Sequence, residues 1–572
     1  MVSRSDYQRP GLSEAATPFI PETRTHDARD ETLAGLIPLE VALSTKAIAW
    51  RAIGPMTWIA RADPSAEDAI RAALPPGIGP VFFIDMDRSR IEAELRAAHG
   101  AALARRAETL CPEEASCRGF EASVARRAGL GALGLLALLI VFAPSLFLTL
   151  LIGWIVVMTA ANTAIRLAAL LGRRETIPDI QPKAALLPVV SILVPVYREG
   201  PVLAALMAAL GRLDYPHDKL DVKLLLEEDD DETPRALATL GLPGFVEVIT
   251  VPDGRLRTKP RAMNYALPFC RGEIVGIYDA EDKPEPDQIR KAVGVLAASP
   301  ADVACVQAAL DFHNPRDNWL TRCFTIEYAI WFRVLLHGVR RLGLPIPLGG
   351  TSLFIRRRVL EEIGAWDAHN VTEDADLGMR LERHGYRTGL VPSTTWEEAN
   401  GSLPSWLRQR SRWLKGYAMT WVTQMRDPAA LWRELGPRRF LGLQVLLLGS
   451  VTAYLAMPLW WVLVGVSVTG ASSGILSGVP GPLAAAFWAL LPLAQIVMLA
   501  AALRALMGTG RRGLIPWVFT LPAYWSLGAI SAWRAVFEIF SAPFHWHKTA
   551  HGRNAAARSA DHAPKSVSAS AP

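Results

Sequence analysis

Two long hydrophobic blocks constrain this chain more than any other feature of its sequence. The first covers residues 128–171, where Arg166 is the one charged side chain, and the second follows Arg438 and Arg439 and extends to about residue 540. A helix needs about 20 apolar residues to cross a bilayer, and its backbone amides must be bonded within the structure. With 51% hydrophobic and 20% charged residues, the chain is predicted to place membrane helices on both sides of a polar body.

Pro144 divides the first block into two predicted helices joined by a tight turn, and arginine pairs on either side place both ends of this block in the cytosol. The second block, 440–540, contains three candidate spans at about 440–468, 483–506 and 514–537. Three crossings would put the C-terminus outside, whereas the basic tail 541–572 favours the cytosol. One segment is therefore expected to be a short hairpin or an interfacial helix, and the expected total is five or six.

The polar body between the blocks, residues 175–437, has the alternation of an α/β domain. Helix-like stretches at 202–213 and 287–298 lie between runs that are rich in β-branched residues. These strand-like runs are 188–197, 221–228, 246–251, 273–279 and 303–310. Such alternation predicts a mostly parallel sheet with its ligand site at the carboxyl ends of the strands.

The N-terminal part is predicted to form a tail and a small domain. Residues 1–30 are rich in Pro, Thr and charge and have no apolar core, so they are expected to be a flexible tail and not a signal peptide. The pattern of residues 31–120 predicts a small α+β adaptor domain with the order strand, helix, strand, helix. This pattern loosely resembles the N-terminal domain of secretion ATPases, some relatives of which bind a cyclic dinucleotide. A ligand-free adaptor is favoured, because a fold does not imply a function.

Three carboxylates follow the apolar run 273–278 directly, at Asp279, Glu281 and Asp282. Carboxylates this crowded repel one another unless a cation lies between them. Oxygen ligands select Mg²⁺ or Mn²⁺, which keep water and substrate phosphate in their coordination shell. The pattern predicts a metal site for a nucleotide diphosphate, and a solvated acidic turn is the alternative.

A second acidic motif, Thr372-Glu373-Asp374, precedes a predicted helix that Thr372 can cap. Helix starts favour acidic residues in any case. In a functional interpretation, Asp374 is a general base that takes a proton from an acceptor hydroxyl.

A third motif, Gln409-Arg410-Ser411-Arg412-Trp413, lies ahead of the second membrane block. Basic residues in this place are typical of the cytosolic flank of a membrane helix. Trp413 beside Gln409 and Arg412 also offers a stacking face and hydrogen-bond donors, which suit a sugar ring and a diphosphate.

Together, DAED at 279–282, TED at 372–374 and QRSRW at 409–413 resemble the signatures of family 2 glycosyltransferases of the cellulose and hyaluronan synthase type. The resemblance covers residues 190–426 and implies a GT-A-like nucleotide-sugar transferase domain embedded in an α-helical transmembrane protein. It implies that Asp374 and Glu373 are catalytic, and that Asp279 binds the metal with either Glu281 or Asp282. It also implies a set of substrate-binding residues: Pro195, Tyr197, Glu199, Glu228, Asp229, Lys259, Asn264, Asp279, Gly350, Thr351, Gln409, Arg412, Trp413 and, in a C-terminal gating segment, Trp546, Lys548 and Thr549. Glu228 departs from the family pattern, which has Asp at this position.

The predicted function is that of a multi-pass glycosyltransferase of the bacterial inner membrane with its catalytic domain in the cytosol. With Mg²⁺ or Mn²⁺, it would use a nucleotide sugar, UDP-glucose or UDP-GlcNAc, to build a β-linked polysaccharide with inversion and to extrude it. The alternatives are transfer of one sugar to a lipid or protein acceptor, and a nucleotide-sugar sensor without catalysis. The expected partners are the nucleotide-sugar donor, a growing glycan and the bilayer. Accessory secretion subunits are a further candidate. A net charge of +5 gives no indication of nucleic-acid binding.

Overall fold

The computed structural model describes residues 29–172, 177, 179, 180, 182–468, 478–507 and 509–545. Most of the two predicted tails, 1–30 and 541–572, lies outside these residues, and so do Trp546, Lys548 and Thr549. The chain divides into two compact units after Gly100. Residues 101–120, which the sequence assigned to the small domain, therefore pack with the second unit.

The first unit contains a three-stranded sheet in the order β1-β2-β3. β1 and β2 are antiparallel, and β3 is parallel to β2. The sequence predicted one strand where the structure has a hairpin, because Gly54 adopts a φ of +57° and lets the chain reverse. The elements are α1 Leu39–Thr45, β1 Ala47–Ile53, β2 Met56–Arg61, α2 Glu67–Ala73, β3 Val81–Asp85 and α3 Arg88–Thr109, which ends in the second unit. The resemblance to secretion ATPases stays a prediction.

The second unit is built on an eight-stranded sheet in the order β6-β5-β4-β7-β10-β9-β11-β8. The strands are β4 Val190–Val196, β5 Leu220–Glu227, β6 Val246–Val251, β7 Ile274–Ile277, β8 Lys283–Pro284, β9 Val303–Phe312, β10 Leu353–Arg356 and β11 Arg387–Glu397. All five predicted strands are present, and β4, β5, β6 and β7 are parallel to their neighbours in this group. β10, however, is antiparallel to both β7 and β9, so the sheet is mixed instead of mostly parallel.

Helices pack against this sheet, and two of the three predicted motifs lie on them. The centre of the core is formed by β4 and β5, where Ile192, Val194, Val222 and Leu224 are completely buried. The helices of this part are α6 Gly200–Leu210, α7 Glu232–Leu237, α8 Lys259–Ala266, α9 Gln288–Ala298, α10 Trp319–Ile330, α11 Leu336–Arg341, α12 Arg357–Glu362, α13 Glu373–Arg383, α14 Leu403–Gln424 and α15 Pro428–Leu443. The DAED turn follows β7, TED begins α13, and QRSRW lies within α14.

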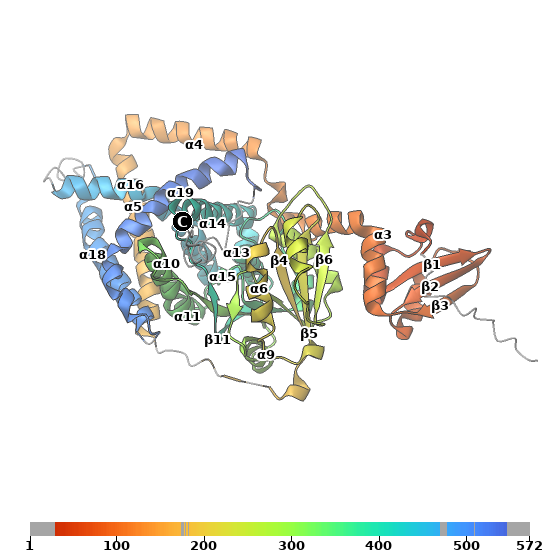
Figure 1. Cartoon of the computed structure of the whole chain (residues 1–572). Coiled ribbons are helices and arrows are strands. Elements are labelled where there is room, and N and C mark those ends of the chain that lie inside the picture. The colour runs from red at the N-terminus through yellow and green to blue at the C-terminus, as the bar shows by residue number, and fades with distance from the viewer. Residues whose placement is uncertain are drawn as a thin grey trace, which may run out of the picture. The chain divides into compact units, whose positions relative to one another are not determined.

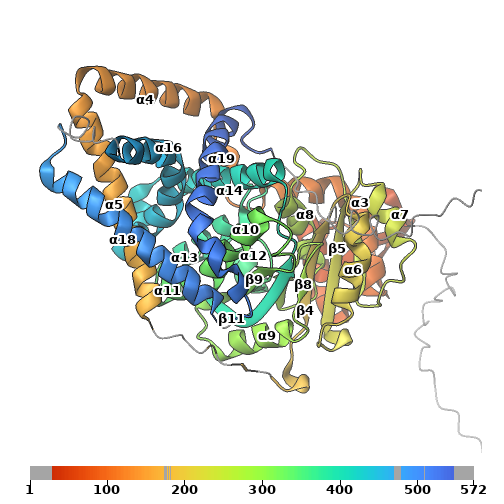
Figure 2. The ribbon, with the colours of Figure 1, turned by 60° about the vertical axis from the view of Figure 1, so that its left-hand side comes forward.

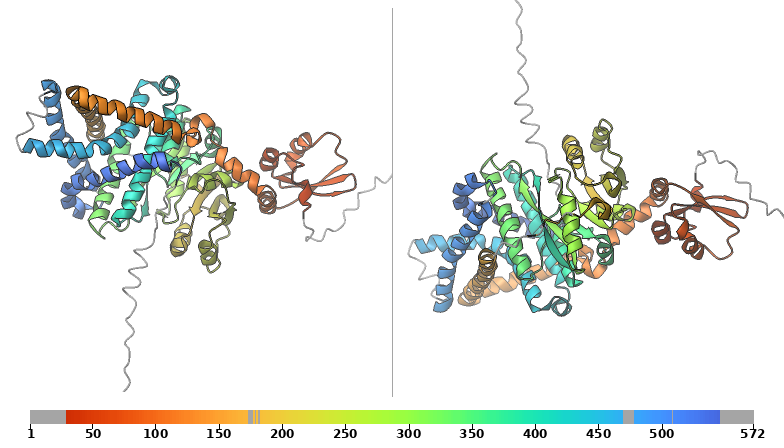
Figure 3. Two further views of the ribbon diagram at one scale, coloured as in Figure 1. Left: turned by 90° about the horizontal axis from the view of Figure 1, so that it is seen from above. Right: turned by 90° about the horizontal axis from the view of Figure 1, so that it is seen from below.

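Five helices in the described part of the chain are long and apolar enough to cross a membrane. They are α4 Ala122–Phe142, α5 Pro144–Leu171, the continuous stretch Pro428–Val466 that runs from α15 into α16 (Gly449–Val468), α18 Gly481–Leu506, and Arg512–Ser541, which ends in α19 Leu521–Ser541. The first break falls at Pro144, as predicted. Figures 1 and 2 show α4 running away from α5 at this junction instead of returning alongside it. All five lie together on one side of the second unit (Figure 3).

Candidate active site

The turn after β7 presents Asp279 at the carboxyl end of the parallel strands, as the sequence predicted. The backbone N–H of Asp279 donates to Oδ2 of Asp282 at 2.8 Å and to Oγ1 of Thr351 at 3.3 Å. The hydroxyl of Thr351 donates to the same Asp282 oxygen. Burial and the charge of Asp279 raise the pKa of Asp282 well above its usual value. Asp282 therefore holds the turn in shape, whereas Asp279 and Glu281 line a large cavity.

The acids of this turn fit a divalent metal ion. Glu397, at the end of β11, is half-buried close to Asp279, Glu281 and Asp282, and desolvation together with their charges raises its pKa well above the usual value. Such like-charge crowding is relieved by a cation, and the donor atoms are all oxygens, as Mg²⁺ and Mn²⁺ require. Among the described residues, no three His, Cys, Asp or Glu side chains form a metal cluster by themselves. Mg²⁺ is commonly held by one or two carboxylates together with substrate phosphates.

Lys259, the first residue of α8, lies between the acidic turn and α13. Its Nζ atom donates to the carboxylate of Asp279 and, at 2.7 Å, to the carbonyl oxygen of Gly350. Burial lowers the pKa of Lys259, but the carboxylates of Asp279, Glu373 and Asp374 outweigh burial and raise it above the usual range. A charged ammonium group is therefore held where the predicted diphosphate would lie.

Asp374 lies on the first turn of α13 and faces Gly350. A Cβ atom at Gly350 would be 3.4 Å from Oδ2 of Asp374 and 4.0 Å from Nζ of Lys259, so glycine keeps the space between these two groups open. Burial raises the pKa of Asp374. Burial, with the charge of Asp374 adding to it, raises the pKa of Glu373 to about 8. A raised pKa makes the carboxylate of Asp374 a stronger base than an exposed aspartate, as a general base requires.

The loop before α13 is held by α14. Arg412 donates to the carbonyl oxygen of Val371 at 3.2 Å. Thr372 occupies the N-cap position, but its side chain makes no capping hydrogen bond, contrary to the prediction from the sequence. Its backbone N–H donates instead to Oδ1 of Asn370 at 3.0 Å. A Cβ atom at Gly416 would overlap the Thr372 side chain, so α14 and this loop are in direct contact.

Trp413 lies at the cavity wall with Gln409 and Arg412, as predicted. The guanidinium carbon of Arg410 is 4.7 Å from the centre of the Trp413 ring. Arg410 also forms a bidentate ion pair with Glu327, with distances of 3.1 and 2.5 Å. This ion pair is not evident from the sequence, because Glu327 lies in α10, far from the QRSRW motif and without a recognisable motif of its own.

The predicted nucleoside residues are placed only in part at the cavity. Pro195, Tyr197 and Glu199 line it. The hydroxyl of Tyr197 donates to Oδ2 of Asp229 at 3.1 Å, and Arg257 donates to the same oxygen at 2.6 Å. The end of β4 and the turn after β5 are thus linked.

Three predicted substrate contacts, Glu228, Asp229 and Asn264, do not line the cavity. Glu228 is exposed and accepts the backbone N–H of Asp253 at 2.9 Å. The preceding residue, Glu227, lines the cavity instead, and burial raises its pKa to about 7. Asn264 is 1% exposed, and its amide nitrogen donates to the carbonyl oxygens of Ala107 and Trp366 at 2.9 and 2.7 Å. Asn264 therefore joins segments of the scaffold.

The cavity has a volume of about 780 Å³ and extends from the acidic turn to the candidate membrane helices. Asp279, Asp374 and Trp413 line one part of it. The other part is lined by side chains of α5, α16, α18 and α19, including Trp154, Asn162, Tyr454, Trp460, Gln495 and Trp525. The predicted donor and acceptor groups therefore share one space with the candidate membrane helices.

The last described residues lie beside this site. Lys415 is completely buried, and its Nζ atom donates to the carbonyl oxygens of Ala542 and His545 at 3.2 and 3.0 Å. The rings of Phe544 and His369 meet edge to face, with centroids 5.3 Å apart. The predicted gating residues Trp546, Lys548 and Thr549 follow directly but lie outside the described residues.

Comparison with known proteins supports the predicted class. Residues 274–527 match the family described as "Glycosyl transferase family group 2". The prediction of a family 2 glycosyltransferase is therefore supported over the region that contains the DAED, TED and QRSRW motifs.

Among curated proteins, the chain is similar to a probable glycosyltransferase, YdaM, of Bacillus subtilis, with 30% identity over 42% of this chain and 58% of that protein. It is 28% identical to the beta-monoglucosyldiacylglycerol synthase of Synechocystis over 48% of this chain and 58% of that protein. It is 27% identical to the cellulose synthase 1 catalytic subunit of Komagataeibacter xylinus over 47% of this chain and 35% of that protein. The chain thus spans little more than half the length of the first two of these relatives.

Among solved structures, the mannosyltransferase PcManGT of Pyrobaculum calidifontis, in complex with GDP-Man and Mn²⁺, aligns with a TM-score of 0.39 and 22% identity. The alignment covers 67% of this chain and 99% of that one.

Proposed function

We propose that this protein is a metal-dependent, inverting glycosyltransferase of the bacterial inner membrane, with its catalytic domain in the cytosol, that transfers sugar from a nucleotide donor to a growing β-linked glycan. The observation that carries the proposal is the shared cavity, which Asp279, Lys259, Asp374 and Trp413 line together with the membrane helices. UDP-glucose and UDP-GlcNAc are the proposed donors. The names of the relatives, which include cellulose and glucosyl-lipid synthases, support β-linked products.

In the proposed reaction, Lys259 and Arg412 bind the diphosphate while Asp374 takes the proton of the acceptor hydroxyl. Asp279 and Glu281 would hold Mg²⁺ or Mn²⁺, which, when bound, neutralises charge on the leaving diphosphate. Glu281 is preferred over Asp282, because one oxygen of Asp282 already accepts two hydrogen bonds. Attack on the face opposite the leaving group inverts the anomeric carbon.

The proposed acceptor end rests on Trp413, whose ring offers a stacking face for a sugar. From there, the cavity continues between α5, α16 and α18, which supports extrusion of the product through the membrane helices. The apolar side chains along the same helices support a second candidate, in which a single sugar is transferred to a lipid acceptor. Product length separates the two.

The first experiment measures turnover by the purified full chain in liposomes with labelled UDP-glucose or UDP-GlcNAc and Mg²⁺ or Mn²⁺. Asp374→Asn is expected to lower kcat at least about a hundredfold while nucleotide binding is retained. Asp231→Asn, the same change at a carboxylate whose side chain is 84% exposed, is the control and should leave kcat unchanged. Full activity in Asp374→Asn would refute the assigned role of Asp374, and binding of UDP without turnover of any sugar would favour the sensor.

The second experiment sizes the product. A polymer that is protected inside the liposomes supports synthesis with extrusion. A lipid that carries one sugar would refute it and support the second candidate.

A further inference from the structure

The segment 107–118 contacts two loops of the proposed site, although it contains no transferase motif and none of its residues lines the cavity. It begins in the last turn of α3 and ends shortly before α4. Its polar contacts reach the loop ahead of Lys259 and the loop ahead of Asp374. In the first contact, Glu108 of the segment binds the loop ahead of Lys259. In the second, Asp367 of the loop ahead of Asp374 binds the segment.

Glu108 binds the loop ahead of Lys259. Its Oε1 atom accepts the backbone N–H groups of Arg255 at 2.8 Å and Leu256 at 3.4 Å, and it lies 3.5 Å from Nε of Arg261. A Cβ atom at Gly254 would be only 2.5 Å from the same Glu108 oxygen. A side chain at Gly254 would have to displace Glu108 or Arg261, so the loop is in close contact with Glu108 at the point where it leads into α8.

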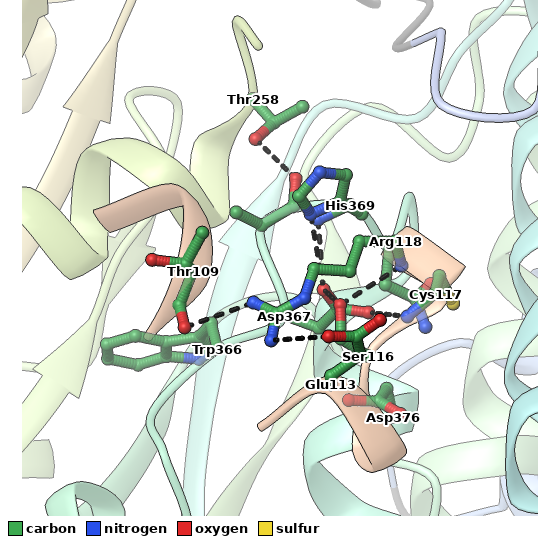
Figure 4. Close-up of polar contacts among 12 residues, drawn as sticks. Thr109, Glu113, Ser116, Cys117, Arg118, Thr258, Trp366, Asp367, His369 and Asp376 are labelled. Carbon is green, nitrogen blue, oxygen red and sulfur yellow. Dashed lines mark hydrogen bonds and ion pairs between the residues drawn. The ribbon is translucent and has the colours of Figure 1, made fainter. Parts of the chain in front are cut away.

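Asp367 is completely buried in the loop ahead of Asp374 and accepts two hydrogen bonds from the 107–118 segment (Figure 4). The hydroxyl of Ser116 donates to Oδ1 at 2.7 Å, and the backbone N–H of Cys117 donates to Oδ2 at 2.6 Å. A third donor, the N–H of His369, lies in the same loop at 3.1 Å. Hydrogen bonds to a buried carboxylate are among the strongest in proteins.

The two loops are also joined to each other. The hydroxyl of Thr258 donates to the carbonyl oxygen of Ala368 at 2.9 Å (Figure 4). Thr258 precedes Lys259 directly, so this hydrogen bond joins the start of α8 to the loop that leads to Asp374. The relative placement of these two loops therefore sets where Lys259 and Asp374 lie with respect to each other.

We propose that Glu108 and Asp367 are positioning residues, through which the 107–118 segment holds the loop of Lys259 and the loop of Asp374 in their working arrangement. The inference rests on the proposed transferase activity. Because each carboxylate holds a different loop, their effects on catalysis separate. Loss of the Glu108 contact affects donor binding, and loss of the Asp367 contact affects the chemical step.

The test uses the full chain and compares kcat with the KM for the nucleotide sugar. Asp367→Asn is expected to lower kcat roughly ten- to a hundredfold with little change in donor KM, since a misplacement of about 1 Å costs this much. Glu108→Gln is expected to raise donor KM roughly tenfold with a smaller effect on kcat. Ser116→Ala, which removes one of the hydrogen bonds to Asp367, should give a weaker form of the Asp367→Asn result.

Asp221→Asn is the matched control, because Asp221 is 4% exposed and accepts the hydroxyl of Ser191 at 2.6 Å and the N–H of Arg271 at 2.9 Å. It lies at the start of β5, away from the carboxyl ends of the strands. We expect it to lower the melting temperature without changing kcat or KM. Equal kinetic losses in Asp221→Asn and Asp367→Asn would overturn the proposal, because the effect would then be general destabilisation.

A readout without turnover keeps this inference separate from the proposed function. Amide hydrogen exchange of residues 366–374 should become faster in Asp367→Asn and Ser116→Ala and stay unchanged in Asp221→Asn. If the wild-type protein turns over no donor, the proposed function fails while the exchange result still decides the inference. Unchanged exchange in this loop would overturn it.

Discussion

Gly416→Ala is a small change that should reach the proposed base through packing alone. A Cβ atom built on Gly416 overlaps Oγ1 and Cγ2 of Thr372 and lies 2.7 Å from its Cβ. Carbon atoms in contact prefer separations of about 3.5–4.0 Å, so one of the two backbones must move by roughly 1 Å. Thr372 is 4% exposed and its χ1 is stiff, so its side chain cannot turn aside. The movement is therefore expected to reach Asp374, two residues further on.

A misplacement of about 1 Å costs about a hundredfold in rate, or about 2.7 kcal/mol of transition-state stabilisation. We expect kcat to fall by this amount with donor KM nearly unchanged, in steady-state assays with a saturating acceptor. Gly134→Ala in α4 is the control, because no atom lies within 4 Å of its Cβ position. The double variant Gly416→Ala/Thr372→Ala should recover part of the loss relative to Thr372→Ala alone. Wild-type kcat in Gly416→Ala would refute the reasoning.

Two further changes test the electrostatics and space of the site, and a third tests a buried carboxylate near the end of α13. Gly350→Ala places a methyl group 3.4 Å from Asp374 Oδ2 and 4.0 Å from Lys259 Nζ, so it should fold normally but raise substrate KM about tenfold or more; unchanged steady-state kinetics would contradict this. Arg412→Gln removes a charge that lowers the pKa of Asp374, so the acid limb of the kcat–pH profile should move to higher pH; a shift to lower pH would exclude the pairing. Burial raises the pKa of Glu382 from 4.5 to about 7, so its contribution to stability is complete below pH 4.5 and is lost as the pH rises through 7. Glu382→Gln should remove about 3 kcal/mol of this pH dependence, and a melting curve series from pH 4.5 to 8 that matches wild type would contradict it.

Local patterns predicted most of the strands and the main catalytic candidates. The five predicted strands were recognised because β-branched runs with flanking helices have a strong periodic signal. Asp279, Asp374 and Trp413 were recognised because each belongs to a short motif whose residue types suit one chemistry. These are properties of neighbouring residues, which a sequence displays directly.

Contacts between distant segments could not be predicted in this way. Glu227 and Glu228 are adjacent acids at the end of β5, and successive side chains of a strand point to opposite faces, so only the folded sheet decides which one faces the cavity. β10 is four residues long, and its antiparallel place between β7 and β9 depends on partners far away in the chain. The polar side chain of Asn264 suits a binding residue. Its hydrogen-bond partners Ala107 and Trp366, however, are more than 100 residues away in the sequence.

The sequence by itself determined that hydrophobic helices flank an α/β domain with three acidic or aromatic motifs, because burial in a bilayer and the periodicity of strands are written in local composition. Only the tertiary structure decided that these motifs share one cavity with the candidate membrane helices, and that the segment 107–118 contacts the loops of Lys259 and Asp374. The physical reason is that hydrogen bonds and packing act over a few ångströms in space, whereas the residues that make them here are separated by up to several hundred positions in the chain.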